Sequence, residues 1–151
     1  MKAISISIFL FLILTICAFT SHAQFYKNAI GIRLSPTTPN IQSGFTYKHF
    51  FNHTNAVEGI FSLANGTGIC GLYEIHQPIM ITNLEVFAGV GGYAAFNHNV
   101  SYVGGAGIIG VDYKFQSIPL NVSIDWKPEL NLTPRIYFEP AAVGFSVRFT
   151  F

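Results

Sequence analysis

Hydrophobic and polar residues alternate along most of this chain with a period of two. The clearest run covers residues 120–132, where Leu120, Val122, Ile124 and Trp126 share one face and polar or charged residues fill the other. Residues 141–151 alternate in the same way up to the final Phe151. Because successive side chains of a strand point to opposite faces, the pattern predicts β-strands with one apolar and one polar face.

Turn and loop sequences rich in proline, glycine and asparagine separate these alternating segments, as expected for hairpins. The predicted strands are residues 28–34, 41–50, 56–64, 69–76, 84–96, 103–115, 120–132 and 141–151. Pro128 lacks a backbone donor and predicts a bulge or a strand end inside the seventh segment. Since the count is even and glycines permit bending, we expect an all-β fold, an eight-stranded antiparallel up-and-down transmembrane β-barrel.

The first 23 residues differ from the rest of the chain. Lys2 precedes an almost wholly apolar run over residues 3–19, and Ser21 and Ala23 supply the small residues of a signal-peptidase site. This predicts a cleaved signal peptide at residues 1–23 and a single outer-membrane barrel domain at residues 24–151. An N-terminal anchoring helix is the alternative.

The composition favours a membrane barrel over a soluble domain. Charged residues make up 10% of the chain and hydrophobic residues 50%, whereas a soluble domain carries about 25% charged residues. A net charge of +1 offers no basic footprint for nucleic acid. Cys17 would leave with the signal peptide, so Cys70 has no cysteine with which to form a disulfide or a multi-cysteine zinc site.

The charges indicate which face of the barrel lies inside. After the signal peptide, Lys27, Arg135 and Glu139 alone fall outside the polar faces of the predicted strands, whereas a soluble barrel would spread charge over its turns and outer surface. We therefore expect a lumen filled by paired charges, because an unpaired buried charge is costly. The predicted lumen network is Arg33, Lys48, Glu58, Glu74, Glu85, Asp112, Lys114, Asp125, Lys127, Glu129 and Arg148.

On this assignment the apolar face is the outer surface. Tyr47, Tyr73, Tyr113 and Trp126 are then the candidates for the aromatic girdles at the membrane interfaces. The alternative is a soluble β-sandwich with buried ion pairs.

The signal peptide, the alternating hairpins, residues 123–128 (Ser-Ile-Asp-Trp-Lys-Pro) and residues 144–151 (Gly-Phe-Ser-Val-Arg-Phe-Thr-Phe) carry a resemblance. Together they resemble small outer-membrane β-barrel proteins of the kind common in Bacteroidetes and, more loosely, eight-stranded barrels of the OmpX/OmpA type. The resemblance implies a bacterial outer-membrane location with both chain ends in the periplasm. The terminal pattern of Phe145, Val147, Phe149 and Phe151 is similar to the signal read by the barrel-assembly machinery.

The resemblance implies no activity, since barrels of this size serve many roles. We expect outer-membrane lipid and, during biogenesis, the assembly machinery as partners. We also expect no nucleic acid partner and a monomer, with a surface partner left unidentified.

Candidate chemistry is sparse. No pair of histidines has the spacing of a metal site, and Glu74 and His76 share a strand face that predicts one hydrogen-bonded pair in the lumen. His98 and Ser101 lie close in sequence but fall on opposite faces of an extended segment, with no acid nearby. We predict no catalytic residue, no metal and no cofactor. The expected role is structural or surface-interacting, without an open channel; a narrow solute pore and a lipid A-modifying enzyme are the alternatives.

Overall fold

A computed structural model of the chain describes residues 26–36, 40–64 and 66–151. The predicted signal peptide lies outside these residues. The described chain is all-β, and it contains no helix long and apolar enough to cross a membrane. The strands are β1 (Asn28–Leu34), β2 (Gly44–Phe50), β3 (Asn55–Ser62), β4 (Thr67–Pro78), β5 (Leu84–Asn97), β6 (Val100–Lys114), β7 (Leu120–Trp126), β8 (Glu129–Thr133), β9 (Tyr137–Glu139) and β10 (Val143–Thr150).

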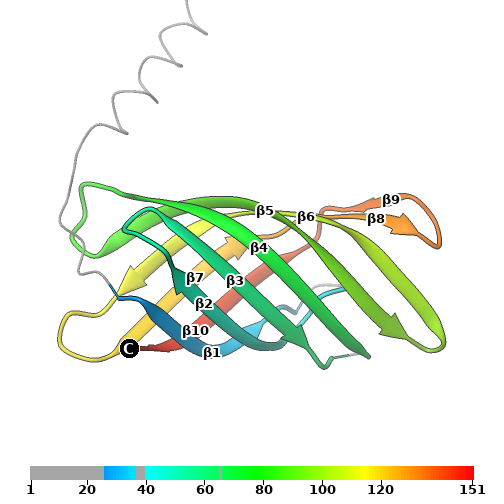
Figure 1. Ribbon diagram of the computed structural model, residues 1–151, viewed down its shortest axis with the longest axis horizontal. Coiled ribbons are helices and arrows are strands. Elements are labelled where there is room, and N and C mark those ends of the chain that lie inside the picture. The colour runs from blue at the N-terminus through cyan, green and yellow to red at the C-terminus, as the bar shows by residue number, and fades with distance from the viewer. Residues whose placement is uncertain (1–25, 37–39, 65) are drawn as a thin grey trace, which may run out of the picture.

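These strands close into a barrel (Figure 1). From β1 to β6 each strand pairs antiparallel with the next, β7 and β8 both pair with β6, and β10 joins β7 to β1. The strands β7 and β8 together form the seventh strand of the ring, and β9 and β10 form the eighth. The predicted eight-stranded antiparallel barrel is therefore confirmed.

The strands are tilted relative to the barrel axis. A path that starts at Thr150 and steps from each residue to its paired residue on the next strand does not return to Thr150. It ends at Glu139, which lies on β9 in the same, eighth strand of the ring. The path runs through Ala29, Lys48, Glu58, Leu72, Gly91, Ala106 and Glu129. Such a stagger requires tilted strands, as in other closed barrels.

The two ends of the barrel differ in what they carry. At one end Asn28 and Phe151 exchange two backbone hydrogen bonds of 2.9 Å, so both ends of the described chain meet there. We call this end the chain-end mouth and the opposite end the loop mouth. The hairpin of β8 and β9 and the tip of β5 and β6 lie together at the loop mouth (Figure 1).

Pro128 interrupts the seventh strand, as its sequence predicts. The strand β7 ends at Trp126 and β8 begins at Glu129. Pro128 cannot donate a hydrogen bond, but its carbonyl accepts one from the Gly107 amide at 3.0 Å. The predicted bulge or strand end is therefore a short break in an otherwise continuous strand.

Three predicted segments differ most from the structure. Residues 41–43, predicted as the start of the second strand, fold into the loop mouth, and Ile41 is fully buried there. The predicted loop at 97–102 shrinks to His98 and Asn99, which turn the chain with φ of 44° and 66°, a region that asparagine tolerates. The predicted loop at 133–140 contains β9.

Interior glycines make room for charged side chains that point into the lumen. A Cβ atom at Gly144 would lie 2.1 Å from Arg33 Nη2, and one at Gly110 would lie 2.7 Å from Asp125 Cβ. By contrast, a Cβ atom at Gly71, which faces outward, would meet no atom within 4 Å. Glycines on β10 and β6 therefore accommodate charged side chains from the neighbouring strands β1 and β7.

Candidate functional site: the charged lumen

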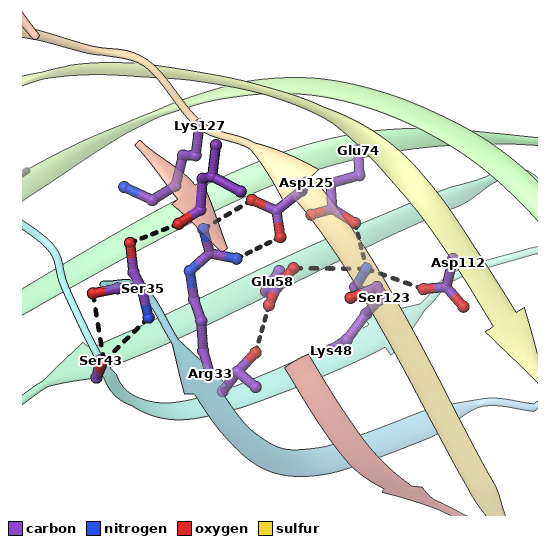
Figure 2. Close-up of polar contacts among 12 residues, drawn as sticks. Arg33, Ser35, Ser43, Lys48, Glu58, Glu74, Asp112, Ser123, Asp125 and Lys127 are labelled. Carbon is purple, nitrogen blue, oxygen red and sulfur yellow. Dashed lines mark hydrogen bonds and ion pairs between the residues drawn. The ribbon is translucent and has the colours of Figure 1, made fainter. Parts of the chain in front are cut away.

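Lys48 on β2 is the hub of the lumen. Its Nζ atom lies 2.8 Å from Glu74 Oε2 and 3.4 Å from both Glu58 Oε2 and Asp112 Oδ2. Three further strands, β3, β4 and β6, supply these carboxylates, as Figure 2 shows. The Phe87 ring lies 4.4 Å from the ammonium group and adds a cation–π contact. One cation thus ties four strands together inside the barrel.

Arg148 on β10 also contacts the cluster around Lys48, through the carboxylate of Glu58. Its Nη2 atom pairs with Glu58 Oε1, its Nη1 atom donates to Ser123 Oγ at 2.8 Å, and its Nε atom donates to Thr46 Oγ1 at 3.3 Å. The Thr46 hydroxyl in turn donates to Glu58. All of these side chains are buried, so the guanidinium exchanges water for charged and polar partners.

A second ion pair lies nearer the loop mouth. The guanidinium of Arg33 on β1 donates two hydrogen bonds to the Asp125 carboxylate on β7, one of them at 2.7 Å (Figure 2). This is the two-point geometry in which arginine and a carboxylate match best. The pair is fully buried, because the absence of a side chain at Gly144 leaves space for the guanidinium.

A third ion pair lies next to the break in the seventh strand. Lys127 Nζ pairs with Glu129 Oε1, and both side chains are fully buried. Glu129 also accepts the backbone amides of Asn40 at 2.8 Å and Ile41 at 3.2 Å. Lys127 is also labelled in Figure 2.

His76 lies between two carboxylates and two aromatic rings. Its Nε2 atom is 2.9 Å from Glu74 Oε2, as the shared strand face predicts, and its Nδ1 atom is 3.3 Å from Glu85 Oε2. The imidazole stacks on Phe87 at 4.9 Å and meets the edge of Phe50 at 4.7 Å. The side chain of Glu85 is 17% exposed, so this acid lies at the rim of the lumen.

Tyr26 extends this aromatic group at the chain-end mouth. Its ring meets Phe50 edge to face at 5.0 Å. Burial, together with the negative charge of Asp112, raises the pKa of the Tyr26 hydroxyl well above its ordinary value. Among the described residues this hydroxyl has no hydrogen-bond partner. Tyr26 precedes the first predicted strand, so the alternating pattern gave no signal for it.

Part of the lumen is apolar, which the alternating pattern does not predict. We call this set the apolar cluster: Ile41, Ile60, Cys70, Leu72, Phe87, Tyr93, Ala95, Ala106 and Ile108. Apart from Ile41, these residues come from β3 to β6, whereas Arg33, Lys48 and Arg148 come from β1, β2 and β10. The strands β3 to β6 also supply Glu58, Glu74 and Asp112, so the apolar cluster occupies one part of the lumen and the carboxylates another.

Lys114 lies apart from the ion pairs. Its Nζ atom donates to the backbone carbonyls of Phe115 and Ile118 and so holds the turn after β6. Glu85 contacts His76, and the other predicted network residues contact one another in the three groups of ion pairs described above. Asn121, an uncharged residue outside the predicted network, contributes too: its side-chain amide donates to Asp112, and its side-chain carbonyl accepts from Arg148.

The proposed girdle residues occupy two levels of the barrel. Tyr113 lies near the chain-end mouth, and the Tyr47 hydroxyl donates to Asn28 at the start of β1 at 2.9 Å. Tyr73 and Trp126 lie midway along their strands of the ring. Tyr47, Tyr73 and Trp126 are all exposed.

The C-terminal strand presents its apolar residues outward. Phe145, Phe149 and Phe151 are exposed, and the last two rings stack at 6.3 Å. Val147, between them in the pattern, is half-buried and pairs with Ile32. The residues of the predicted assembly signal therefore lie on one outer face of β10 and at the residue that follows it.

The chemistry of the lumen is mutual neutralisation. Each buried cation has at least one carboxylate partner, and within the described part of the chain no group of three or more His, Cys, Asp or Glu side chains could hold a metal ion. Comparison with protein-family models, with curated proteins and with solved structures found no match to this chain.

Proposed function

We propose that this protein is an integral β-barrel of a bacterial outer membrane, exported by its N-terminal signal peptide. The observation that carries the proposal is its inverted polarity. Each of the ten strands contributes at least one exposed large hydrophobic residue to the outer surface, while the buried lumen holds Arg33, Lys48, Lys127 and Arg148. A soluble monomer rarely exposes apolar patches of more than a few hundred Å², whereas lipid requires this outer surface.

Strand lengths and the placement of charge support the same proposal. The strands β4, β5 and β6 contain 12, 14 and 15 residues, more than the roughly 9–11 that a tilted strand needs to cross a bilayer, whereas β1, β2 and β3 contain 7, 7 and 8. The charged residues outside the lumen lie near the two mouths: Lys27 precedes β1, Arg135 follows β8 and Glu139 ends β9. A closed ring leaves no unpaired strand edge within the lipid.

Within the membrane we propose a structural or surface-interacting role without an open channel. An eight-stranded barrel is just wide enough for its own side chains to fill it. Here the Lys48 and Arg148 cluster, the Arg33–Asp125 pair and the apolar cluster occupy successive parts of the lumen. A mobile ion would have to separate buried ion pairs in order to pass.

Cell fractionation combined with gel mobility tests the proposal. The protein should sediment with outer membranes, resist carbonate extraction, and migrate differently on SDS gels with and without boiling. Recovery as a soluble periplasmic protein with one gel mobility would overturn it. Single-channel current from purified protein in planar bilayers would overturn the closed lumen and favour a narrow pore. A change in lipid A mass on overexpression would favour an enzyme.

A further inference from the structure

Residues 40–43 close the loop mouth from inside. They precede β2, and Ile41 is fully buried within the apolar cluster. A Cβ atom at Gly68, on β4, would lie 2.6 Å from Ile41 Cδ1. The Ile41 side chain therefore fills space that this glycine leaves free on β4.

Polar side chains hold this segment in place. The amides of Asn40 and Ile41 donate to the two oxygens of Glu129, at 2.8 and 3.2 Å, and the Gln42 amide donates to Ser62 Oγ at 3.1 Å. The Asn40 side chain donates to the Tyr93 hydroxyl at 2.9 Å. Three consecutive amides thus bond to side chains and not to a neighbouring strand.

Glu129 has the properties of a latch. It is fully buried, it binds two consecutive amides, and Lys127 neutralises its charge. A charged acceptor holds an amide more tightly than a neutral one does. When these contacts break, residues 40–43 can move with the loss of one backbone hydrogen bond, from the Leu63 amide to the Ser43 carbonyl at 3.2 Å, because the ladders of β2 with β1 and β3 begin only at Gly44. Local opening of this kind requires less free energy than global unfolding.

We infer that residues 40–43 form a strap, latched by Glu129, whose release opens the apolar cluster to small apolar molecules at the loop mouth. Cys70 lies in that cluster and is 1% exposed. Its thiol therefore reports the opening of the strap without an introduced label. The inference depends on the geometry of the mouth and not on the membrane around the barrel.

The test is the rate at which methyl methanethiosulfonate, a small neutral thiol reagent, modifies Cys70 in the folded protein in detergent. Mass spectrometry of the Cys70 peptide gives this rate. Glu129→Leu alone would leave the buried Lys127 ammonium without a carboxylate partner. The latch variant therefore combines Glu129→Leu with Lys127→Met. Loss of hydrogen bonds to a charged acceptor should accelerate modification about tenfold or more. Amide exchange at Asn40 and Ile41 should accelerate as well.

Ile41→Ala provides an independent variant, because it removes the side chain that fills the mouth and leaves Glu129 intact. It should also accelerate modification of Cys70, and it decides the question if the double variant does not fold. Glu139→Gln is the matched control: this carboxylate lies at the same mouth but accepts the Ala141 amide at 2.9 Å, so the rate should not change.

Two results would overturn the inference. One is an unchanged Cys70 rate in the variants that retain heat-modifiable gel mobility. The other is an increase that tracks global unfolding, seen as the same steep dependence on denaturant for Cys70 modification and for loss of the barrel.

Discussion

Arg148, three residues from the end of the chain, pairs with Glu58 on β3 across the lumen. The two residues are not on neighbouring strands, since β10 pairs with β1 and β7, and β3 pairs with β2 and β4. The ion pair therefore spans the barrel rather than one ladder. It couples the last strand to the first half of the chain independently of the β1–β10 seam that closes the ring.

Replacing Arg148 should consequently destabilise the whole barrel. Arg148→Leu leaves Glu58 buried with only Lys48, at 3.4 Å, as its cation, and breaking a buried pair costs about 3–5 kcal/mol. Urea unfolding in lipid vesicles, followed by the fluorescence of the single tryptophan Trp126, measures the loss. Arg135→Leu, at an exposed turn, is the control and should change nothing measurable. Equal stability of the two variants would refute the bridging role.

The alternating pattern puts Arg148 and Asp125 on the polar face of their strands, because side-chain direction in a strand is a local property, and both are buried in the structure. The pattern did not indicate their partners. Arg148 pairs with Glu58 and Asp125 with Arg33, and these pairings depend on which long side chains reach across the barrel. Partner choice depends on tilt and register, which no local pattern encodes.

The same limit explains the wrong start of the second strand. An inward strand position and an inward-folded strap both bury Ile41, so its hydrophobicity cannot distinguish them. Glu129, which lies far away in the sequence, accepts the amides of Asn40 and Ile41. In a strand, backbone amides would instead donate to a neighbouring strand. The break at Pro128 was predictable, since it depends only on a missing backbone donor.

Two glycines that face opposite sides of the barrel wall should respond differently to the same substitution. At Gly144 an added Cβ atom would lie 2.1 Å from the Arg33 guanidinium, whereas at Gly71 it would meet nothing within 4 Å. Gly144→Ala should destabilise by about 1–3 kcal/mol through overpacking and displace Arg33 from Asp125. Gly71→Ala should be neutral or mildly stabilising, because alanine restricts the unfolded chain. The urea midpoints of the two variants give the comparison. Similar losses of stability in both variants would contradict the close packing of Arg33 against Gly144.

Phe151 should matter for assembly more than for the stability of the finished barrel. Its ring is 61% exposed, while its backbone pairs with Asn28 at 2.9 Å, so Phe151→Ala removes the ring and retains the seam. We expect less folded barrel in the outer membrane, with an unchanged urea midpoint for the fraction that assembles. Phe138→Ala, an exposed aromatic on β9, should leave the membrane yield unaltered. A lowered midpoint at normal yield would assign Phe151 a structural role instead.

Removing a hydroxyl should have opposite effects at Tyr26 and Tyr93. Within the described residues the Tyr26 hydroxyl is buried without a hydrogen-bond partner, and a buried polar group in that situation costs about 1–3 kcal/mol. Tyr26→Phe keeps the ring against Phe50 and should raise the free energy of unfolding by about 1 kcal/mol. The Tyr93 hydroxyl accepts from Asn40 at 2.9 Å and donates to Asn131 at 3.2 Å, so Tyr93→Phe should lower it by about as much.

Both values come from urea unfolding of the two variants in the same vesicles, with the parent protein measured alongside. Because the two substitutions delete the same atom from the same residue type, differences in hydrophobicity cancel and the sign reports the hydrogen bonding of each hydroxyl. A loss of stability in Tyr26→Phe equal to that in Tyr93→Phe would show that the Tyr26 hydroxyl is bonded in the folded barrel. The chain-end mouth would then be a hydrated polar site and not one closed by the packed rings of Tyr26 and Phe50.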